Sequence, residues 1–552
     1  MQDISKLIKM SVLDLYDEKV EVELTQPEPK FGDFACSVAL MLASEVGRSP
    51  REIAQEIADK IKTNEQIANV DVAGPGFINI KLTDKTLLSM AKVYPAQSFK
   101  GKVVLTEYSD PNPFKVLHAG HLYTTVAGDA ISKLFEAAGA KVHRVNFGGD
   151  VGLHVGRTMW AILQKLGGEN PEALKKVSEN KRADWLADAY VKGTAAYEDD
   201  EKAKKEIIDL NKKVYQLHKD NDHKSEFAQI YWTTREWSYQ AFDAFYARLG
   251  TKFDKYYPES EVTQLGLQTV KDNIGKVYEE SDGAVVFKGE EHDLHTRVFI
   301  NREGLPTYEA KDVGLIMHKQ QDFNPDLSVI LTGNEQEHYL NVVMKSIEQF
   351  NPDLVAKTKH IHNGLLKMSG GEKMSSRKGN ILKATDILDE VKSIVEKEHG
   401  KENSIAISLG AIRYALLKNR IGGDIHFDIK ESVSLQGNSG PYLQYAHARA
   451  RSILSKTKLT PRVADELTDE ERTLVRKISE YSMVVDEAAL ELAPHKICTF
   501  LFDLAHEFNR FYEGNRIVGD SREGERLTIV NLYADTLKHG LQLLGIEPLE
   551  TM

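Results

Sequence analysis

The chain has little cysteine, no long apolar run and no excess of positive charge. Its 552 residues include only Cys36 and Cys498. Both lie among apolar residues, which is typical of buried core thiols rather than of a disulfide or a metal site. No run of about 18 apolar residues is present, so no membrane span is predicted. The net charge of −12 argues against a protein that coats nucleic acid, but it leaves room for a local basic patch.

The first residues, Met1-Gln2-Asp3-Ile4, lack the basic and then apolar pattern of a signal peptide. We therefore expect a cytoplasmic protein in a reducing compartment. The length predicts several domains. No heptad pattern or strand-pairing signal stands out, so we expect a monomer.

The N-terminal part reads as a small α+β domain, assigned to residues 1–97. Amphipathic helices are predicted at residues 37–46 and 50–61, and Ser49 followed by Pro50 is a typical helix start. We expect this additional domain to contact nucleic acid.

From residue 102 the pattern changes to an α/β alternation. A strand at 103–105, a helix at 122–138 and a strand at 142–147 predict a Rossmann-type, doubly wound parallel sheet. This catalytic domain is assigned to residues 98–390, with a helical insertion around 157–250.

The sheet is expected to continue through the apolar segments 285–287, 297–300 and 327–331. After residue 405 the pattern is helical to the end. Residues 391–552 are therefore predicted to form an all-α helical bundle.

The motif His118-Ala119-Gly120-His121 follows the first α/β strand and opens the next helix. A helix N-terminus binds phosphate readily, and Gly120 lets a nucleotide approach the backbone. Imidazoles at i and i+3 can donate hydrogen bonds to phosphate as charge builds in a transition state. Read alone, the pair fits ordinary surface or capping histidines better, and no nearby Cys or carboxylate completes a zinc site.

A second motif, Lys373-Met374-Ser375-Ser376-Arg377-Lys378, lies in a glycine-rich loop. Its cations could close over a triphosphate while Ser375 hydrogen-bonds it. A solvated basic loop is the alternative. Together the two motifs predict a site that binds ATP without a Walker loop, with no structural metal.

These motifs resemble class I aminoacyl-tRNA synthetases: HAGH is similar to their HIGH signature and KMSSR to KMSKS. The segments Phe31–Ala35, Gly74–Asn79, Gly148–Gly152 and Gly440–Arg449 extend the resemblance, over nearly the whole chain, to arginyl-tRNA synthetases. The family implies a ligase that uses ATP, with Mg²⁺, to form arginyl-adenylate and then arginyl-tRNA. It also implies that arginine activation needs bound tRNA.

The resemblance assigns the catalytic and ATP-binding roles. The catalytic candidates are His118, His121, Lys373, Arg377 and Lys378, and ATP is also assigned to Lys115, Gly120 and Ser375. The fourth position of the second motif is Ser376 rather than lysine. Which of Lys115, Arg377 and Lys378 replaces that lysine is left open.

The family pattern also assigns an arginine pocket. A planar, permanently cationic guanidinium calls for carboxylates in fork geometry. Glu259 and Asp312 match the family's guanidinium carboxylates, with Tyr308 packing on or bonding to the same group. Asn112 and Gln336 match the residues that hold the α-amino and carboxylate end.

Basic and aromatic residues in the helical bundle are candidates for tRNA contact. Tyr442, Tyr445 and Arg449 are spaced to share a helix face, and Arg451 and Tyr512 are added. Packing inside the bundle is the alternative for the tyrosines. Two other functions remain open: a class I synthetase for another amino acid such as cysteine, and a non-catalytic RNA-binding paralogue.

Overall fold

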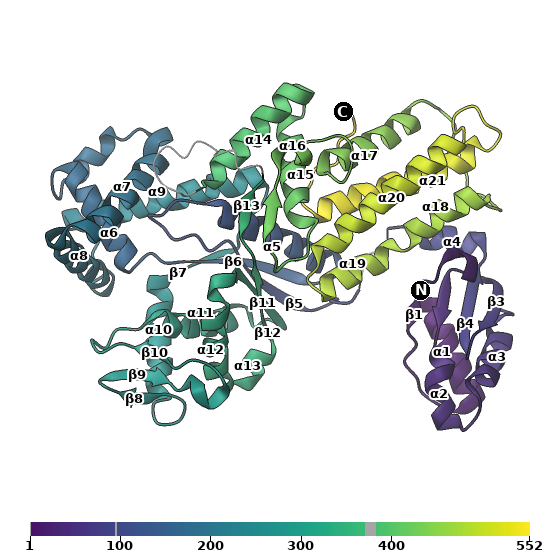
Figure 1. The fold of residues 1–552 in the computed structure, drawn as a ribbon, viewed down its shortest axis with the longest axis horizontal. Helices are drawn as coiled ribbons and strands as arrows, with labels where there is room; N and C mark the ends of the chain where they lie inside the picture. Colours follow the sequence, from purple (N-terminus) through teal and green to yellow (C-terminus); the bar gives the residue numbers. More distant parts are fainter. Residues whose placement is uncertain (1, 94–96, 370–381) are drawn as a thin grey trace.

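The computed structural model describes residues 2–93, 97–369 and 382–552 and has an elongated shape (Figure 1). The N-terminal domain lies at one end and a group of insertion helices at the other. The parallel sheet lies between them, and the long C-terminal helices connect it to the N-terminal domain. Among the described helices, none combines the length and apolar character needed to cross a bilayer.

The N-terminal domain packs three helices on a four-stranded antiparallel sheet of order β1-β2-β4-β3. Helix α3 begins as predicted, because Ser49 Oγ accepts a hydrogen bond from the Glu52 amide at 3.3 Å and Pro50 holds the first helical position. The elements are α1 Gln2–Tyr16, β1 Leu24–Thr25, β2 Phe34–Cys36, α2 Val38–Val46, α3 Pro50–Ile61, β3 Ile67–Ala73 and β4 Phe77–Leu82, followed by α4 Asp84–Met90.

The central domain contains a five-stranded, fully parallel sheet of order β12-β11-β5-β6-β7. The order reverses at β5, so β5, β6 and β11 meet at the switch point where doubly wound sheets bind ligands. The strands are β5 Val103–Glu107, β6 Lys141–Gly148, β7 Lys255–Pro258, β11 Leu327–Gly333 and β12 Thr358–Asn363. The predicted fold class is confirmed.

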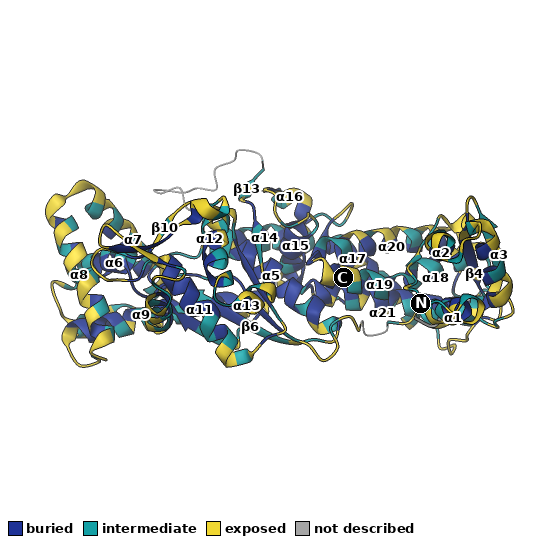
Figure 2. Ribbon diagram, turned by 90° about the horizontal axis from the view of Figure 1, so that it is seen from below, coloured by how far each residue is buried: buried dark blue, intermediate teal, exposed yellow. Residues whose placement is uncertain are grey.

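Helices cover this sheet and extend from it. Helix α5, Ala119–Ala137, is buried along almost its whole length, and Figure 2 shows it within the dark core while insertion helix α8 is largely exposed. The other helices are α6 Leu153–Leu166, α7 Arg182–Asp199, α8 Glu201–Lys219, α9 Glu226–Leu249, α10 Glu259–Asp272, α11 Tyr308–Phe323, α12 Glu337–Glu348 and α13 Pro352–Ala356. Helices α6 to α9 lie in the region where the sequence analysis expects the helical insertion, around residues 157–250.

Two expectations about strands are wrong. Strands β9 (Ala284–Phe287) and β10 (Arg297–Ile300) do not continue the parallel sheet; with β8 (Glu279–Ser281) they form a separate antiparallel sheet. The turn Asp282-Gly283 has positive φ at both residues, 49° and 77°. An Asp-Gly pair with that geometry is a hairpin signal, whereas a short apolar run by itself fits either kind of strand.

The C-terminal part is not entirely helical either. Strand β14, Ile425–Phe427, pairs in parallel with β13, Leu366–Met368. This pairing connects the C-terminal part to the catalytic domain. The helices are α14 Ala384–His399, α15 Ser404–Leu417, α16 Ile429–Ser432, α17 Gly440–Ser455, α18 Asp469–Ser479, α19 Tyr481–Leu490, α20 Pro494–Gly514 and α21 Glu523–Leu543. Helix α14 spans the boundary expected at residue 390.

A buried ion pair joins the catalytic and C-terminal parts. The guanidinium of Arg413 on α15 lies 2.9 Å from the carboxylate of Asp129 on α5, and both side chains are 1% exposed. Arg413 also donates to the carbonyl oxygens of Leu249 at 2.5 Å and Leu544 at 3.1 Å. Four chain segments therefore meet at one cation.

We predict that Asp129→Ala destabilises the protein strongly. Removing one partner of a buried pair leaves an uncompensated charge and typically costs about 3–5 kcal/mol. The apparent Tm should fall by several degrees. The control is Glu21→Ala, which removes an exposed pair with Lys9 and should change stability by less than about 1 kcal/mol. Equal shifts in the two variants would contradict the prediction.

Candidate functional site

Two adjoining cavities open at the carboxyl ends of the parallel strands. The first has a volume of about 370 Å³ and is lined by residues from β5, α10, α11 and α12. The second, of about 310 Å³, lies over the start of α5. The residues that line both are Asp110, Asn112, Thr332, Glu335 and Gln336. These shared residues mark the junction between the cavities.

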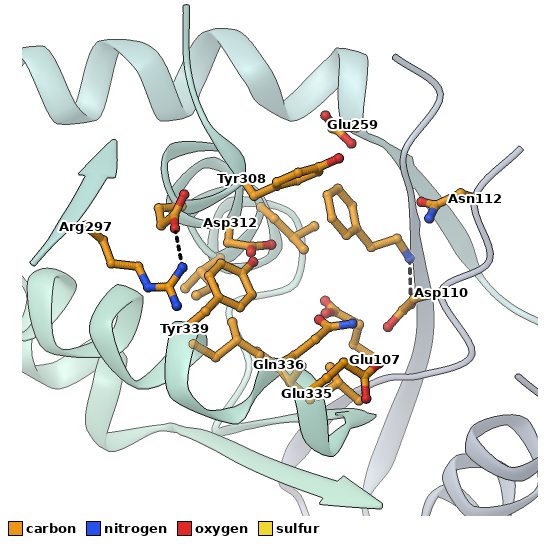
Figure 3. Close-up of a pocket in the computed structure, with 17 residues that line it drawn as sticks. Glu107, Asp110, Asn112, Glu259, Arg297, Tyr308, Asp312, Glu335, Gln336 and Tyr339 are labelled. Atoms are coloured by element: carbon orange, nitrogen blue, oxygen red, sulfur yellow. Dashed lines mark hydrogen bonds and ion pairs between the residues drawn. The ribbon is translucent and has the colours of Figure 1, made fainter. Parts of the chain in front are cut away.

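The first cavity brings together all five residues predicted for arginine. Glu259, Tyr308 and Asp312 line it (Figure 3), and Asn112 and Gln336 lie at the junction. Glu259 begins α10 directly after β7, while Tyr308 begins α11 and Asp312 follows one turn later. Residues from separate parts of the chain, between Asn112 and Gln336, are thereby placed around one cavity.

The two predicted carboxylates differ in charge balance. Glu259 is 2% exposed and is ion-paired with Lys311, which also bonds the Tyr215 hydroxyl at 3.1 Å. Asp312 is 7% exposed and has no hydrogen bond or ion pair within the part of the chain that the structure describes. Burial, and then the nearby Glu107, raises the pKa of Asp312 well above its usual value. Of the two carboxylates expected to bind the guanidinium, one is therefore already neutralised by Lys311.

Further charged residues in this cavity were not predicted from the sequence. Two more of its carboxylates have cationic partners. The pairs are Glu107 with Lys319 at 2.6 Å and Glu309 with Arg297 at 3.1 Å. Lys311 lies between two residues assigned to arginine, Tyr308 and Asp312. The sequence pattern did not indicate that its side chain would turn toward Glu259 rather than toward solvent.

Glycines at the end of β6 allow the site loop to approach closely. A Cβ at Gly148 would lie 2.7 Å from the Pro111 carbonyl oxygen, and a Cβ at Gly149 would lie 2.6 Å from Glu259 Oε2. The Gly149 amide donates to Asn112 Oδ1 at 2.7 Å. This bond orients Asn112 so that its amide nitrogen is left for a ligand.

A buried aspartate, Asp150, holds the first turn of α10 in place. Asp150 accepts hydrogen bonds from the Ser260 amide at 2.9 Å and the Ser260 hydroxyl at 2.8 Å, and from Arg235 Nε at 3.0 Å. Ser260 directly follows Glu259. Asp150 thus fixes the first turn of α10 and links it to the insertion helix α9.

The second cavity is lined by the first motif. His118 is the N-cap of α5: its Nδ1 accepts from the Gly120 amide at 3.1 Å, and His121 Nδ1 accepts from the His118 amide at 3.1 Å. Their ring centroids are 3.9 Å apart. His118, Gly120 and His121 all line the cavity, so the capping role and a ligand-facing role coexist.

The capping bonds fix which ring nitrogen carries the proton. Because Nδ1 of each ring accepts a backbone hydrogen bond, a neutral ring must carry its hydrogen on Nε2. Burial lowers the pKa of His118, and Lys115 lowers it further against the opposing effect of Glu335. Burial, together with His118 and Lys115, also lowers the pKa of His121. Both rings are thus neutral Nε2–H donors at pH 7.

The remaining ATP and catalytic candidates are less directly placed. Lys115 lines neither cavity; its Nζ lies 6.0 Å from the Tyr190 ring centroid, and its pKa is lowered by burial while Glu259 opposes the shift. Lys373, Ser375, Arg377 and Lys378 lie outside the described residues.

The residues predicted for tRNA lie on α17 and α20. Tyr442 packs against Phe502 and accepts a hydrogen bond from Asn509 at 3.0 Å. Arg449 stacks over the Tyr512 ring, 4.5 Å from its centroid. Tyr445, Arg449 and Arg451 line a groove of about 620 Å³ beside the C-terminal residues. Arg451 is ion-paired there with Glu550 at 2.7 Å.

Comparison with known proteins covers the whole chain. Residues 83–429 match the model of the class I (R) tRNA synthetase catalytic domain, residues 2–82 the arginyl tRNA synthetase N-terminal domain, and residues 443–552 the DALR anticodon binding domain. The arginine–tRNA ligase of Borreliella afzelii is 30% identical over 98% of this chain and 95% of its own. That of Flavobacterium psychrophilum is 28% identical over 99% of this chain and 98% of its own.

Solved structures agree on the fold. The arginyl-tRNA synthetase of Thermus thermophilus has a TM-score of 0.82 at 24% identity and covers 100% of both chains. That of Plasmodium falciparum has a TM-score of 0.79 at 20% identity and covers 100% of this chain and 99% of its own. The family model that matches residues 83–429 shows that the chain belongs to the arginyl-tRNA synthetases, the class I ligases for arginine.

Proposed function

We propose how this chain, an arginine–tRNA ligase by its family, divides the reaction between its two cavities. Arginine occupies the first cavity and ATP the second. The observation that carries this division is Asp312, a buried carboxylate without a cationic partner among the described residues, at the wall of a cavity that joins the histidine-lined one. A cationic side chain is the ligand that such a carboxylate favours.

In the first cavity the guanidinium of arginine pairs with Asp312, and Tyr308 covers it. Glu259 accepts a further hydrogen bond while Lys311 keeps its charge balanced. Asn112 and Gln336 hold the α-amino and carboxylate end at the junction. A lysine substrate would fit this set poorly, because a single ammonium does not match the planar fork of guanidinium donors.

In the second cavity the phosphates of ATP lie at the N-terminus of α5. The Nε2–H groups of His118 and His121 donate to phosphate oxygens as negative charge builds, and Gly120 permits close approach. Bound together with ATP, Mg²⁺ would supply charge neutralisation for the leaving pyrophosphate. Lys373, Ser375, Arg377 and Lys378 are assigned to the triphosphate by sequence, and Lys115 supplies a fixed positive potential nearby.

The reaction follows from this alignment. An oxygen of the arginine carboxylate attacks the α-phosphorus of ATP, the bond to the bridging oxygen breaks, and pyrophosphate leaves. The 3′-terminal ribose hydroxyl of tRNA then attacks the carbonyl carbon of arginyl-adenylate and AMP leaves. The protein contributes mainly positioning and charge stabilisation.

The outer domains are assigned to tRNA. Residues 391–552 would read the anticodon end through Tyr442, Tyr445, Arg449, Arg451 and Tyr512, and residues 1–97 would contact another part of the tRNA. The catalytic domain, residues 98–390, would hold arginine and ATP. We propose that the protein acts as a monomer in the cytoplasm.

The deciding experiment is aminoacylation of bulk tRNA with each of the twenty amino acids. Charging with arginine alone is expected. Charging with another amino acid would instead favour a class I ligase of different specificity, and tRNA binding without any charging would favour a non-catalytic paralogue.

We predict that Asp312→Asn weakens arginine binding about 100-fold or more, because truncating one partner of a buried charge pair costs several kcal/mol. Since burial raises the pKa of the Asp312 carboxyl, protons compete with arginine. Wild-type affinity should therefore fall as the pH is lowered from about 8 toward the raised pKa, as measured by isothermal titration calorimetry.

The matched control is Asp322→Asn, which makes the same change on helix α11, where Asp322 pairs with Lys255 and Tyr257. It should leave arginine affinity and its pH dependence unchanged. If Asp312→Asn keeps wild-type affinity, the carboxylate has no place in the pocket.

We predict that Arg449→Ala raises the KM for tRNA several-fold and reduces the slope of log affinity against log salt by about 1. Arg449→Lys should keep most of the salt dependence, because it keeps the charge but loses the planar stack on Tyr512. Filter binding over a salt series measures both. An unchanged slope in the alanine variant would indicate a packing role.

A further inference from the structure

Lys311 is a buried cation placed behind the wall of the arginine cavity. It lies on α11 with 4% of its surface exposed and is ion-paired with Glu259. Glu259 lines the cavity, whereas Lys311 does not. An influence of Lys311 on a ligand in the cavity must therefore pass through Glu259.

The two carboxylate oxygens of Glu259 have different surroundings. Oε1 is held by Lys311 Nζ. Across the described ranges, Oε2 has no hydrogen bond or ion pair. A Cβ at Gly149 would lie 2.6 Å from this oxygen and 2.8 Å from Asn112 Oδ1, so Oε2 lies on the side of the site loop. With Oε1 occupied, Oε2 is the oxygen left to a ligand.

The helical insertion holds Lys311 in this position. Lys311 Nζ donates to the Tyr215 hydroxyl on α8 at 3.1 Å, and Tyr215 lies 96 positions earlier in the chain. Nζ also lies over the rings of Tyr215 and Tyr308, at 5.6 Å and 5.2 Å from their centroids. An ammonium between two aromatic faces and a carboxylate is confined to one place.

A second contact from α8 reaches the same turn of α10. His218 Nε2 bonds the Tyr231 hydroxyl at 2.8 Å, and that hydroxyl donates to the carbonyl oxygen of Asp150 at 2.8 Å. Asp150 in turn holds the first turn of α10. Tyr215 and His218 are three positions apart and share a helix face. One face of α8 therefore supports Glu259 by two separate routes.

We propose that Lys311 is a positioning residue for arginine recognition: held by Tyr215 of the insertion, it orients Glu259 so that Oε2 accepts a hydrogen bond from the guanidinium. This inference rests on the proposed assignment of arginine to the first cavity and goes beyond it. Helices α6 to α9 supply none of the residues that line this cavity. They nevertheless set its affinity for arginine.

The charge of Glu259 also depends on Lys311. Burial raises the pKa of Glu259, and Lys311 is the strongest opposing influence. Asp150 raises this pKa further, while Lys115 lowers it. Without Lys311 the Glu259 carboxyl takes up a proton more readily, and a higher pH restores its charge. The other titratable groups around it supply no cation; they are Tyr215, Tyr231, Tyr308, Asp312 and His154.

The test measures the dissociation constant of L-arginine by equilibrium dialysis on the full chain, with bulk tRNA present, at pH 7 and pH 8.5. Lys311→Met keeps the length of the side chain and removes its charge. We expect it to weaken binding about 10- to 100-fold relative to the wild type at pH 7. The ratio should be smaller at pH 8.5, because Glu259 regains its charge. Lys311→Arg should restore most of the affinity, and the exposed control Lys271→Met should change nothing.

A double-mutant cycle separates positioning from a merely structural role. In a Glu259→Gln background, Lys311→Met should change arginine binding by no more than about twofold, because a neutral amide needs no cation. In arginine-dependent pyrophosphate exchange, Lys311→Met should raise KM and leave kcat within a few fold, since Glu259 binds the end of arginine remote from the reacting carboxylate. Equal losses in both backgrounds, or the same loss at both pH values, would overturn the positioning role.

Tyr215→Phe tests the part played by the insertion. It removes the hydroxyl that Lys311 bonds and keeps the ring, so arginine binding should weaken several-fold. The matched control is Tyr197→Phe on α7, where Tyr197 stacks with Arg157, and it should leave binding unchanged. Wild-type affinity in both Lys311→Met and Tyr215→Phe would overturn this inference alone. Failure of the wild-type chain to bind L-arginine would instead overturn the proposed function.

Discussion

The ion pair between Arg413 and Asp129 is the constraint on which the rest of the structure depends. It fixes α5 between the parallel sheet and the C-terminal helices, with both charges removed from water. A buried charge is tolerated only when its partners are in place, so α15, the end of α9 and the end of α21 must assemble around α5 together. The N-terminus of the same helix carries His118 and His121. The phosphate-binding end of the site is thereby tied to the packing of the C-terminal domain.

The site itself is built by close approach of backbone segments. Gly148 ends strand β6 and Gly149 follows it, and the loop from Ser109 to Phe114 packs against them in a strained conformation. This packing sets Asn112 and Asp110 at the junction of the two cavities. Asp150 holds the start of α10 through two hydrogen bonds from Ser260. Because these contacts are mostly backbone and short side chains, the cavity is largely formed before a ligand enters.

The arginine cavity has less net negative charge than the number of its lining carboxylates indicates. Lys311, Lys319 and Arg297 each neutralise one lining carboxylate. The lining carboxylates without such a cation keep their negative charge for a ligand. A pocket arranged this way favours a ligand whose cations match the remaining carboxylates in number and spacing, and rejection of other ligands follows from leaving buried charge unpaired.

The sequence by itself determined the class of fold, the helix start at Ser49 and the family, because these depend on local patterns and ordered motifs. It also assigned Glu259, Tyr308 and Asp312 to the arginine pocket, though only through the family resemblance. Tertiary structure alone decided that Lys311 turns inward to Glu259, that Asp110 faces the junction, and that β8 to β10 leave the parallel sheet. Side-chain direction and strand partners depend on contacts between residues far apart in the chain, and a linear pattern does not specify those contacts.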